Sequence, residues 1–156
     1  MSDQCLPLDQ PAALHLDNQL CFALYSASLM MTKAYKPLLE KLGLTYPQYL
    51  VMLILWEKDG IGLKDIAERL ITESGALTPV LKRLEQQGLL TRQRIPDNER
   101  ALEIKLTKEG KALQQQAFAV LQQIGLACGM ELTELVRLRT ELQQLRDRIA
   151  TSLNAG

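Results

Sequence analysis

The sequence predicts a mainly α-helical fold, a winged helix-turn-helix with a small antiparallel β-hairpin as its wing, joined to a helical dimerisation region. Three observations lead to this prediction. Residues 63–88 form two amphipathic helical segments linked by a short turn. Residues 89–106 contain two alternating segments, LLTRQR and ALEIKL, on either side of a Pro-Asp-Asn-Glu turn. Longer helical segments flank this unit on both sides.

The composition favours one domain and argues against several kinds of site. The chain has 156 residues, 47% of them hydrophobic and 23% charged, which is sufficient for one buried core. The formal net charge is zero, so a nucleic-acid partner requires a locally basic surface. One histidine, His15, and three cysteines that are far apart leave almost no ligands for zinc. We therefore expect no metal and no cofactor.

The chain divides into an arm and a domain. Residues 1–16 are expected to be a flexible N-terminal arm, and they lack the basic and apolar regions of a signal peptide. No apolar run reaches the ~18 residues of a membrane span, so we expect a cytoplasmic protein with no membrane partner. The expected single domain covers 17–156, with dimerisation helices at 17–44 and 108–153 and a DNA-binding winged helix at 45–107.

The first two helices of the domain have clear boundaries. Asp17 or Asn18 is the expected N-cap of a helix over 19–42, which Gly43 ends. Thr45 is the expected N-cap of the next helix, in which QYLVMLILW is apolar nearly all round. That pattern is typical of a helix buried at the centre of a domain.

The second helix of the helix-turn-helix, ALTPVLKRLEQQG, is expected to enter the major groove of DNA with its N-terminal residues toward the bases. Small side chains at this end suit base edges, and later cations suit phosphates. Asp97 is expected to pair with Arg100 and stabilise the wing. The alternative is that these charges form only a solvated face, but the order of helix, turn, helix and hairpin favours DNA. The candidate DNA-binding residues are Ser74, Ala76, Thr78, Lys82, Arg83, Arg92, Arg94 and Arg100.

Two further helices follow the wing. Thr107 is expected to cap a helix over 108–127, and Thr133 to cap the last helix after a break near Gly129. The last helix has an apolar seam at spacings of 3, 4, 3 and 4 residues. The seam consists of Leu135, Leu138, Leu142, Leu145 and Ile149. It predicts a homodimer, and the alternative is packing of this helix within its own chain.

Cys21 begins a stripe of polar side chains on the first helix. Tyr25, Ser28, Thr32 and Tyr35 follow it at i+4, i+7, i+11 and i+14. Tyr46 lies just beyond the next turn. Hydroxyl donors and the start of a helix both favour a thiolate, which attacks peroxides to give a sulfenic acid. The alternative is an inert buried cysteine. Cys128, near the later helix break, is either a resolving partner for a sulfenic acid or a packing residue.

Three segments resemble the MarR family of winged-helix repressors, and within it the organic hydroperoxide resistance regulators. They are LCFALYSASLMMTKAYKPLLEKLGLTYPQYLVMLILWEKDG, SGALTPVLKRLEQQGLLTRQR and DNERALEIKLTKEG, and the resemblance covers about residues 17–153. It implies a homodimer that binds a pseudo-palindromic double-stranded DNA operator until an organic hydroperoxide oxidises one cysteine. Ala76 departs from the family pattern, where threonine is expected, which puts one base or phosphate contact in doubt.

Carried over by position, the resemblance implies that Cys21 is the sensing cysteine. Tyr35 and Tyr46 would hydrogen-bond it, with Tyr25 nearby. Cys128 matches the late cysteine of the two-cysteine members, which forms a disulfide with the sensing cysteine of the other subunit. Cys5 matches no family position and is expected to be incidental.

Two rival functions remain open from the sequence. The first is a MarR-type repressor released by a small phenolic ligand, with Cys21 silent. The second is a thiol-dependent peroxidase, in which Cys21 turns over and the winged helix has no role. A third possibility, a winged-helix module that binds protein and not DNA, is weakened by Arg92, Arg94 and Arg100 in the wing.

Overall fold

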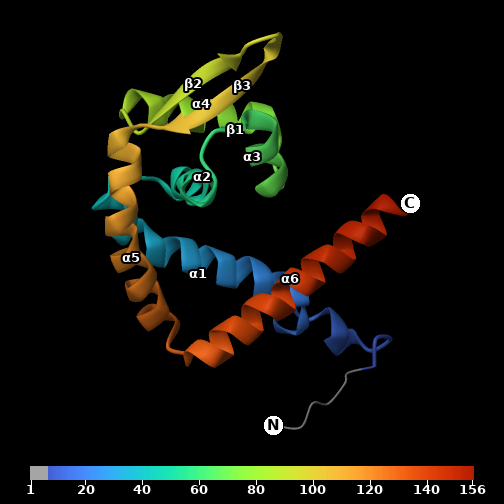
Figure 1. Cartoon of the computed structure of the whole chain (residues 1–156). Coiled ribbons are helices and arrows are strands. Elements are labelled where there is room, and N and C mark those ends of the chain that lie inside the picture. The colour runs from blue at the N-terminus through green and yellow to red at the C-terminus, as the bar shows by residue number, and fades with distance from the viewer. Residues whose placement is uncertain (1–6) are drawn as a thin grey trace.

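The computed structural model describes residues 7–156, except for the side chains of residues 99 and 100. A winged-helix head lies at one end of the molecule, and three long helices extend from it (Figure 1). The head contains α2 (Tyr46–Glu57), α3 (Leu63–Arg69), α4 (Ser74–Gln86) and a small sheet. The long helices are α1 (Leu20–Glu40), α5 (Lys108–Cys128) and α6 (Leu132–Asn154). Two short 3-10 turns, η1 (Pro11–Leu14) and η2 (Leu16–Asn18), precede α1.

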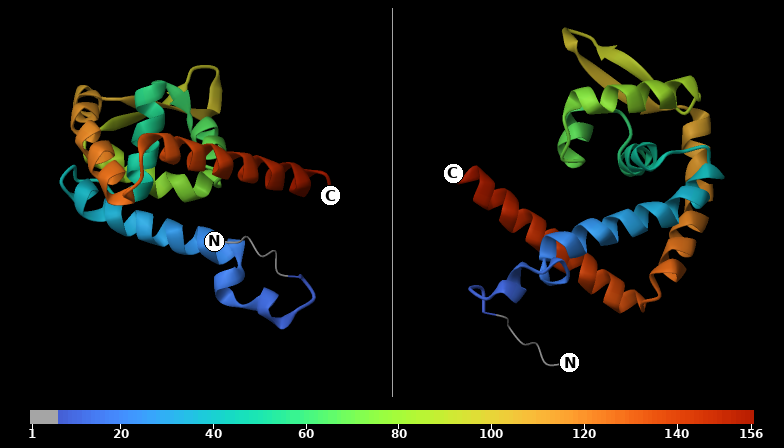
Figure 2. Two further views of the ribbon diagram at one scale, coloured as in Figure 1. Left: turned by 90° about the horizontal axis from the view of Figure 1, so that it is seen from below. Right: turned by 180° about the vertical axis from the view of Figure 1, so that it is seen from behind.

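The sheet is antiparallel and has the strand order β1-β3-β2. Its strands are β1 (Ile61–Gly62), β2 (Leu90–Ile95) and β3 (Asn98–Leu106). The β2–β3 hairpin is the predicted wing, and its tip projects away from the helices in every view (Figures 1 and 2). β1 was not expected, because two residues are too few to show an alternating pattern. Its partners are fixed by the register, in which Ile61 lies opposite Ile104.

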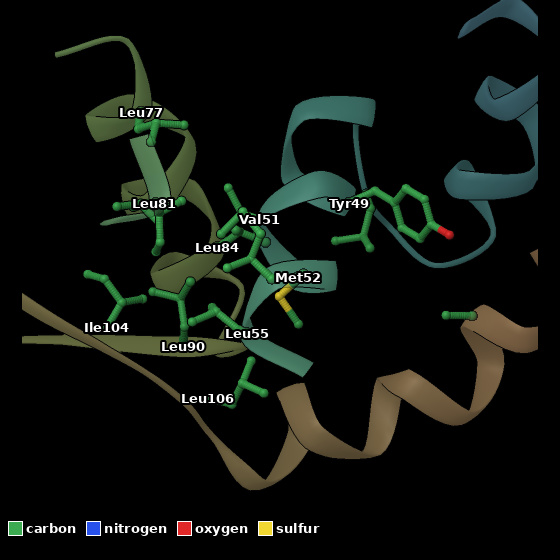
Figure 3. Packing of buried hydrophobic residues seen from close by; sticks show 14 of the residues in the cluster. Tyr49, Val51, Met52, Leu55, Leu77, Leu81, Leu84, Leu90, Ile104 and Leu106 are labelled. Carbon is green, nitrogen blue, oxygen red and sulfur yellow. The ribbon is translucent and has the colours of Figure 1, made fainter. Parts of the chain in front are cut away.

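The core lies inside the head, where α2, α4 and the sheet meet (Figure 3). Val51 and Met52 on α2, Leu84 on α4 and Ile104 on β3 are all fully buried. Burying such a side chain contributes roughly 1.5–3 kcal/mol. Because α2 also contacts α1 and α5, it is covered on nearly every side, which explains why its sequence is apolar all round. This prediction is confirmed.

Two predicted caps are confirmed. Thr45 and Gln48 form a capping box at the start of α2, and the Thr107 hydroxyl accepts a hydrogen bond from the Gly110 N–H at the start of α5. The α1 cap was predicted wrongly. Asn18 lies in η2 and its amide donates instead to the Ala12 carbonyl, so Gln19 takes the N-cap position without a side-chain hydrogen bond to the first turn of α1.

The predicted cap of α6 is also wrong. Glu131 is the N-cap and forms a capping box with Glu134, so Thr133 already lies inside the helix. Two glutamates cap this helix in place of the predicted threonine. The Glu131 carboxylate accepts a hydrogen bond from the Glu134 backbone N–H, and the Glu134 carboxylate accepts one from the Glu131 backbone N–H.

α6 contributes no residue to the core of its own chain. It crosses near the first half of α1, as the two views of Figure 2 also show, and the two helices line an apolar groove of about 540 Å³. Leu138, Leu142, Leu145 and Ile149 of the predicted seam lie along this groove. Three of them, Leu138, Leu142 and Ile149, are 40–48% exposed. The apolar seam of α6 is therefore only partly covered by its own chain, and a second surface can pack against it. Over the described residues, no helix combines the length and apolarity that crossing a membrane requires.

Candidate functional site

The predicted recognition helix α4 presents its N-terminal end to solvent. It begins at Ser74, two residues earlier than predicted, because Glu73 already has the extended backbone of an N-cap. Leu77, Leu81 and Leu84 anchor one face in the core. Ser74, Ala76 and Thr78 lie exposed near the start, and Lys82 and Arg83 are exposed farther along the helix. The small side chains and the two cations are therefore accessible to a partner, and their contacts with bases and phosphates stay a prediction.

The wing carries the other predicted contacts. Arg94 is exposed on β2. Asp97 lies in the hairpin turn with a left-handed backbone, φ 69°, a conformation that aspartate tolerates in turns. The side chain of Arg100 lies outside the described part of the chain, so its predicted pairing with Asp97 stays a prediction. A hollow of about 600 Å³ separates the wing from the starts of α3 and α4, and Lys64, Ser74 and Asn98 line it.

Arg92 is engaged within the chain. Its guanidinium lies 3.1 Å from a Glu85 carboxylate oxygen, and its backbone N–H donates to the other oxygen at 3.0 Å. These side-chain and backbone hydrogen bonds from Arg92 hold the pKa of Glu85 below its usual range. The pair joins α4 to β2 and fixes the wing against the recognition helix. A phosphate contact by Arg92 would have to compete with this pair, which no local pattern in the sequence predicts.

Three tyrosines form a cluster where α1 meets α2. The ring of Tyr35 lies 5.3 Å from that of Tyr46 and 5.5 Å from that of Tyr49, in tilted arrangements. Tyr49 is buried, and its ring points toward α1 (Figure 3). It was not predicted as a site residue, although its spacing of three from Tyr46 places both on one face of α2.

Tyr35 stays protonated over a wide pH range. Burial, followed by the nearby Tyr49, Tyr46 and Cys128, raises the pKa of Tyr35 to about 12. Burial also raises the pKa of Tyr49. A tyrosine that keeps its proton remains a hydrogen-bond donor, so this cluster offers a donor to an anion such as a thiolate.

The two described cysteines lie in different surroundings. Cys128, the last residue of α5, is half-buried against the core and close enough to act electrostatically on Tyr35. Cys21 is exposed in the first turn of α1, fourteen positions before Tyr35, which corresponds to about 21 Å along the helix. Within one chain, Cys21 is therefore remote from Tyr35. Cys5 lies outside the described residues.

The predicted stripe does not form a path of donors from Tyr35 to Cys21 in one chain. The Thr32 hydroxyl donates back to the Ser28 carbonyl at 2.7 Å, and Tyr25 is 63% exposed. The helical spacing was correct, but threonine on a helix bonds its own backbone, and the part of the stripe from Cys21 to Thr32 faces solvent. The tyrosine cluster and Cys21 thus lie at opposite ends of α1.

A cavity of about 360 Å³ adjoins the tyrosine cluster between α1, α2 and α5. Tyr35, Tyr49, Leu53, Trp56 and Phe118 are among the residues that line it, so its walls are mostly apolar and aromatic. Within residues 7–156, no three histidine, cysteine, aspartate or glutamate side chains gather closely enough to hold a metal ion.

Comparisons with known proteins identify the family to which this winged-helix fold belongs. The model of the MarR family matches residues 44–102, the winged-helix head. The organic hydroperoxide resistance transcriptional regulator of Bacillus subtilis (strain 168) is 54% identical over 104 residues, 67% of this chain and 71% of the relative. The chain belongs to the MarR family. Like the relatives found, it is a transcriptional regulator and not an enzyme, which removes the peroxidase hypothesis.

Solved structures extend the MarR-family likeness over most of the chain. Reduced AbfR bound to DNA is 36% identical and superposes with a TM-score of 0.78 over 92% of this chain and 98% of that one. Disulfide-formed AbfR is 37% identical, with a TM-score of 0.61 over 89% of this chain and 92% of that one. AbfR is a protein of Staphylococcus epidermidis. The chain thus has the fold of a MarR-family regulator that binds DNA.

Proposed function

We propose that this chain is a homodimeric repressor that leaves its operator when an organic hydroperoxide oxidises Cys21. The observation that carries the proposal is the tyrosine cluster, which keeps a protonated donor, Tyr35, beside Cys128. The name of the Bacillus subtilis relative supports organic hydroperoxide as the signal. The AbfR structures support a cysteine switch, because one is reduced and bound to DNA and another contains a disulfide.

Cys21 meets the tyrosine donors only if a second chain supplies them. A single chain keeps Cys21 about 21 Å along α1 from Tyr35. In a two-fold dimer built on the open α1–α6 groove, the exposed start of α1 reaches the partner subunit. Tyr35 and Tyr46 then stabilise the thiolate of the partner's Cys21, and Tyr25 is exposed for further contact.

The oxidation has two balanced steps. The Cys21 thiolate attacks one peroxide oxygen, the O–O bond breaks, and the departing alkoxide takes a proton to become an alcohol. Cys21 is then a sulfenic acid. The thiolate of Cys128 of the partner subunit attacks that sulfur, and the hydroxyl leaves as water when it gains a proton. The peroxide is the oxidant, and both thiols supply the electrons.

Disulfide formation requires the two Cα atoms to come within about 7 Å, so any larger separation in the reduced dimer is closed by movement of the end of α5. α5 runs from the wing to Cys128. Both recognition helices must match half-sites about one turn of DNA apart, and a change in their spacing weakens binding. The reduced AbfR structure contains DNA, which supports the reduced form as a DNA-binding state.

The test compares wild type with Cys21→Ser and Cys128→Ser before and after a stoichiometric dose of cumene hydroperoxide. Non-reducing gel mobility reports the disulfide, and fluorescence anisotropy of a labelled operator reports DNA binding. We expect a dimer-sized band and loss of operator binding in wild type. Cys21→Ser is expected to show neither, and Cys128→Ser is expected to lack the band.

Cys5→Ser is the matched control, because it removes a thiol that the mechanism does not use. It is expected to behave as wild type. The proposal is wrong if Cys21→Ser leaves the operator as readily as wild type after peroxide treatment.

The cavity beside Tyr35 favours one second candidate, a repressor released by a small phenolic ligand. Its aromatic walls and volume of about 360 Å³ suit a single aromatic ring. Peroxide-insensitive operator binding together with release by a phenolic acid such as salicylate would support this function over the first.

A further inference from the structure

We infer that Trp56 is the positioning residue through which the tyrosine cluster and α5 set the orientation of the DNA-binding head. Trp56 lies in the last turn of α2, and its ring lines the same cavity as Tyr35. Its indole N–H donates to the Gly110 carbonyl in the first turn of α5 at 2.9 Å. One side chain thus contacts both the sensor cavity and the start of α5. The inference rests on the proposed function.

The start of α5 is fixed closely to the DNA-binding elements. The Thr107 hydroxyl donates to the Gly88 carbonyl at 2.6 Å, and the Thr107 N–H donates to the Leu89 carbonyl at 3.1 Å. Gly88 and Leu89 connect α4 to β2. A Cβ atom on Gly110 would lie 2.0 Å from the Leu89 carbonyl oxygen, so the backbones are in direct contact. Movement of this turn therefore moves the recognition helix and the wing together.

The opposite ends of α2 and α5 carry the sensor groups. α2 begins at Tyr46 and ends one residue after Trp56, and α5 begins near Gly110 and ends at Cys128. Disulfide formation displaces the end of α5 relative to the tyrosine cluster. Because Trp56 and Gly110 join the other ends of these helices, their hydrogen bond couples α2, and with it the tyrosine cluster, to any turn of α5 that the recognition helix and the wing follow.

Asp59 also helps to hold the end of α2 against β3 and the start of α5. Its carboxylate accepts from the Leu106 N–H at 2.8 Å, which ties the end of α2 to β3. Lys111, on the first turn of α5, lies 3.9 Å from its other oxygen. Asp59 does not reach the cavity, whereas Trp56 lines it. Of these two side chains, only Trp56 both lines the cavity beside Tyr35 and bonds to the start of α5.

The test variant is Trp56→Phe, which keeps an aromatic ring in the cavity and removes the N–H donor. The measured quantity is the ratio of the operator Kd of the oxidised protein to that of the reduced protein. We expect this ratio to fall roughly 3- to 10-fold in Trp56→Phe, while the dimer-sized disulfide band still forms. Lys58→Gln is the matched control, because Lys58 follows Trp56 by two residues but is exposed and outside the cavity, and it should keep the wild-type ratio.

The sequence contains one tryptophan, so the intrinsic tryptophan fluorescence of the unmodified protein reports the contact between Trp56 and the start of α5. Oxidation is expected to change the Trp56 emission of wild type and to leave that of Cys21→Ser unchanged. A wild-type Kd ratio in Trp56→Phe, or unchanged emission while the wild-type disulfide forms, overturns this inference alone. Absence of the disulfide and of DNA release in wild type overturns the proposed function, and this inference with it.

Discussion

At the residue scale, Tyr35 has the most perturbed surroundings in the candidate sensor. Its pKa is raised from 10.0 to about 12, first by burial and then by Tyr49, Tyr46 and Cys128. In a titration followed by phenolate absorbance, we expect Tyr35 to ionise near pH 12. Tyr35→Phe should remove this step. A high-pH step that persists in this variant would contradict the assignment.

The same shift makes stability depend on pH in a defined window. The unfolded chain releases the Tyr35 proton near pH 10 and the folded chain near pH 12. The contribution of Tyr35 to stability is therefore complete below pH 10 and is lost as pH rises toward 12. Urea unfolding of wild type and Tyr35→Phe across this window should show a steeper loss of stability in wild type.

At the element scale, the turn between α3 and α4 stores backbone strain. Ile71 has a left-handed φ of 54°, although it is β-branched, and it is 72% exposed. The Thr72 N–H bonds to the Ala67 carbonyl across it, as in a helix ending that normally uses glycine. We expect Ile71→Gly to raise the free energy of unfolding by about 0.5–1 kcal/mol, because relief of strain exceeds the added flexibility.

Ile71→Val is the control for this turn, since it shortens the side chain but keeps the β-branch. It should leave the urea midpoint almost unchanged. Equal stabilisation by valine would mean that the exposed side chain, and not the backbone, sets the energy of the turn.

The contact between α5 and the wing gives a second prediction at this scale. A Cβ on Gly110 would overlap the Leu89 carbonyl oxygen, so Gly110→Ala must push α5 away from the turn that joins α4 to β2. We expect a loss of roughly 2–4 kcal/mol in thermal or urea unfolding. Gly125→Ala, in the same helix with open space around it, should instead be neutral or stabilise by up to about 1 kcal/mol. Equal effects of the two changes would contradict the close contact.

The order and type of the helices and the wing were predictable because periodicity and turn chemistry are local properties. Thr45, Gly43 and Thr107 mark boundaries that the structure confirms. The pairing of Glu85 with Arg92 depends on how α4 packs against β2, which no local pattern contains. The distance between Cys21 and Tyr35 was available from the helical rise, but helical projection shows only the angle around the axis and hides that distance.

At the scale of the whole molecule, the α1–α6 groove predicts how two chains associate. Leu24, Met31, Leu138, Leu142 and Ile149 are among its lining residues, and α6 buries nothing in its own chain. We expect Leu142→Glu to shift the protein from dimer to monomer in sedimentation velocity, because a desolvated carboxylate in an apolar interface costs several kcal/mol. The head should stay folded, since its core contains no α6 residue.

Gln143→Glu introduces the same charge at the next position of α6, outside the groove, and should remain dimeric. The monomer is expected to bind one half-site and to lose most of its affinity for the full operator, because two linked recognition helices bind cooperatively through effective concentration. Peroxide should also fail to produce the disulfide in Leu142→Glu. Within one chain, Cys21 lies in the first turn of α1, whereas Cys128 lies at the end of α5 near Tyr35. A dimeric Leu142→Glu protein would place the interface elsewhere and remove the route by which Cys21 reaches the partner's tyrosine cluster.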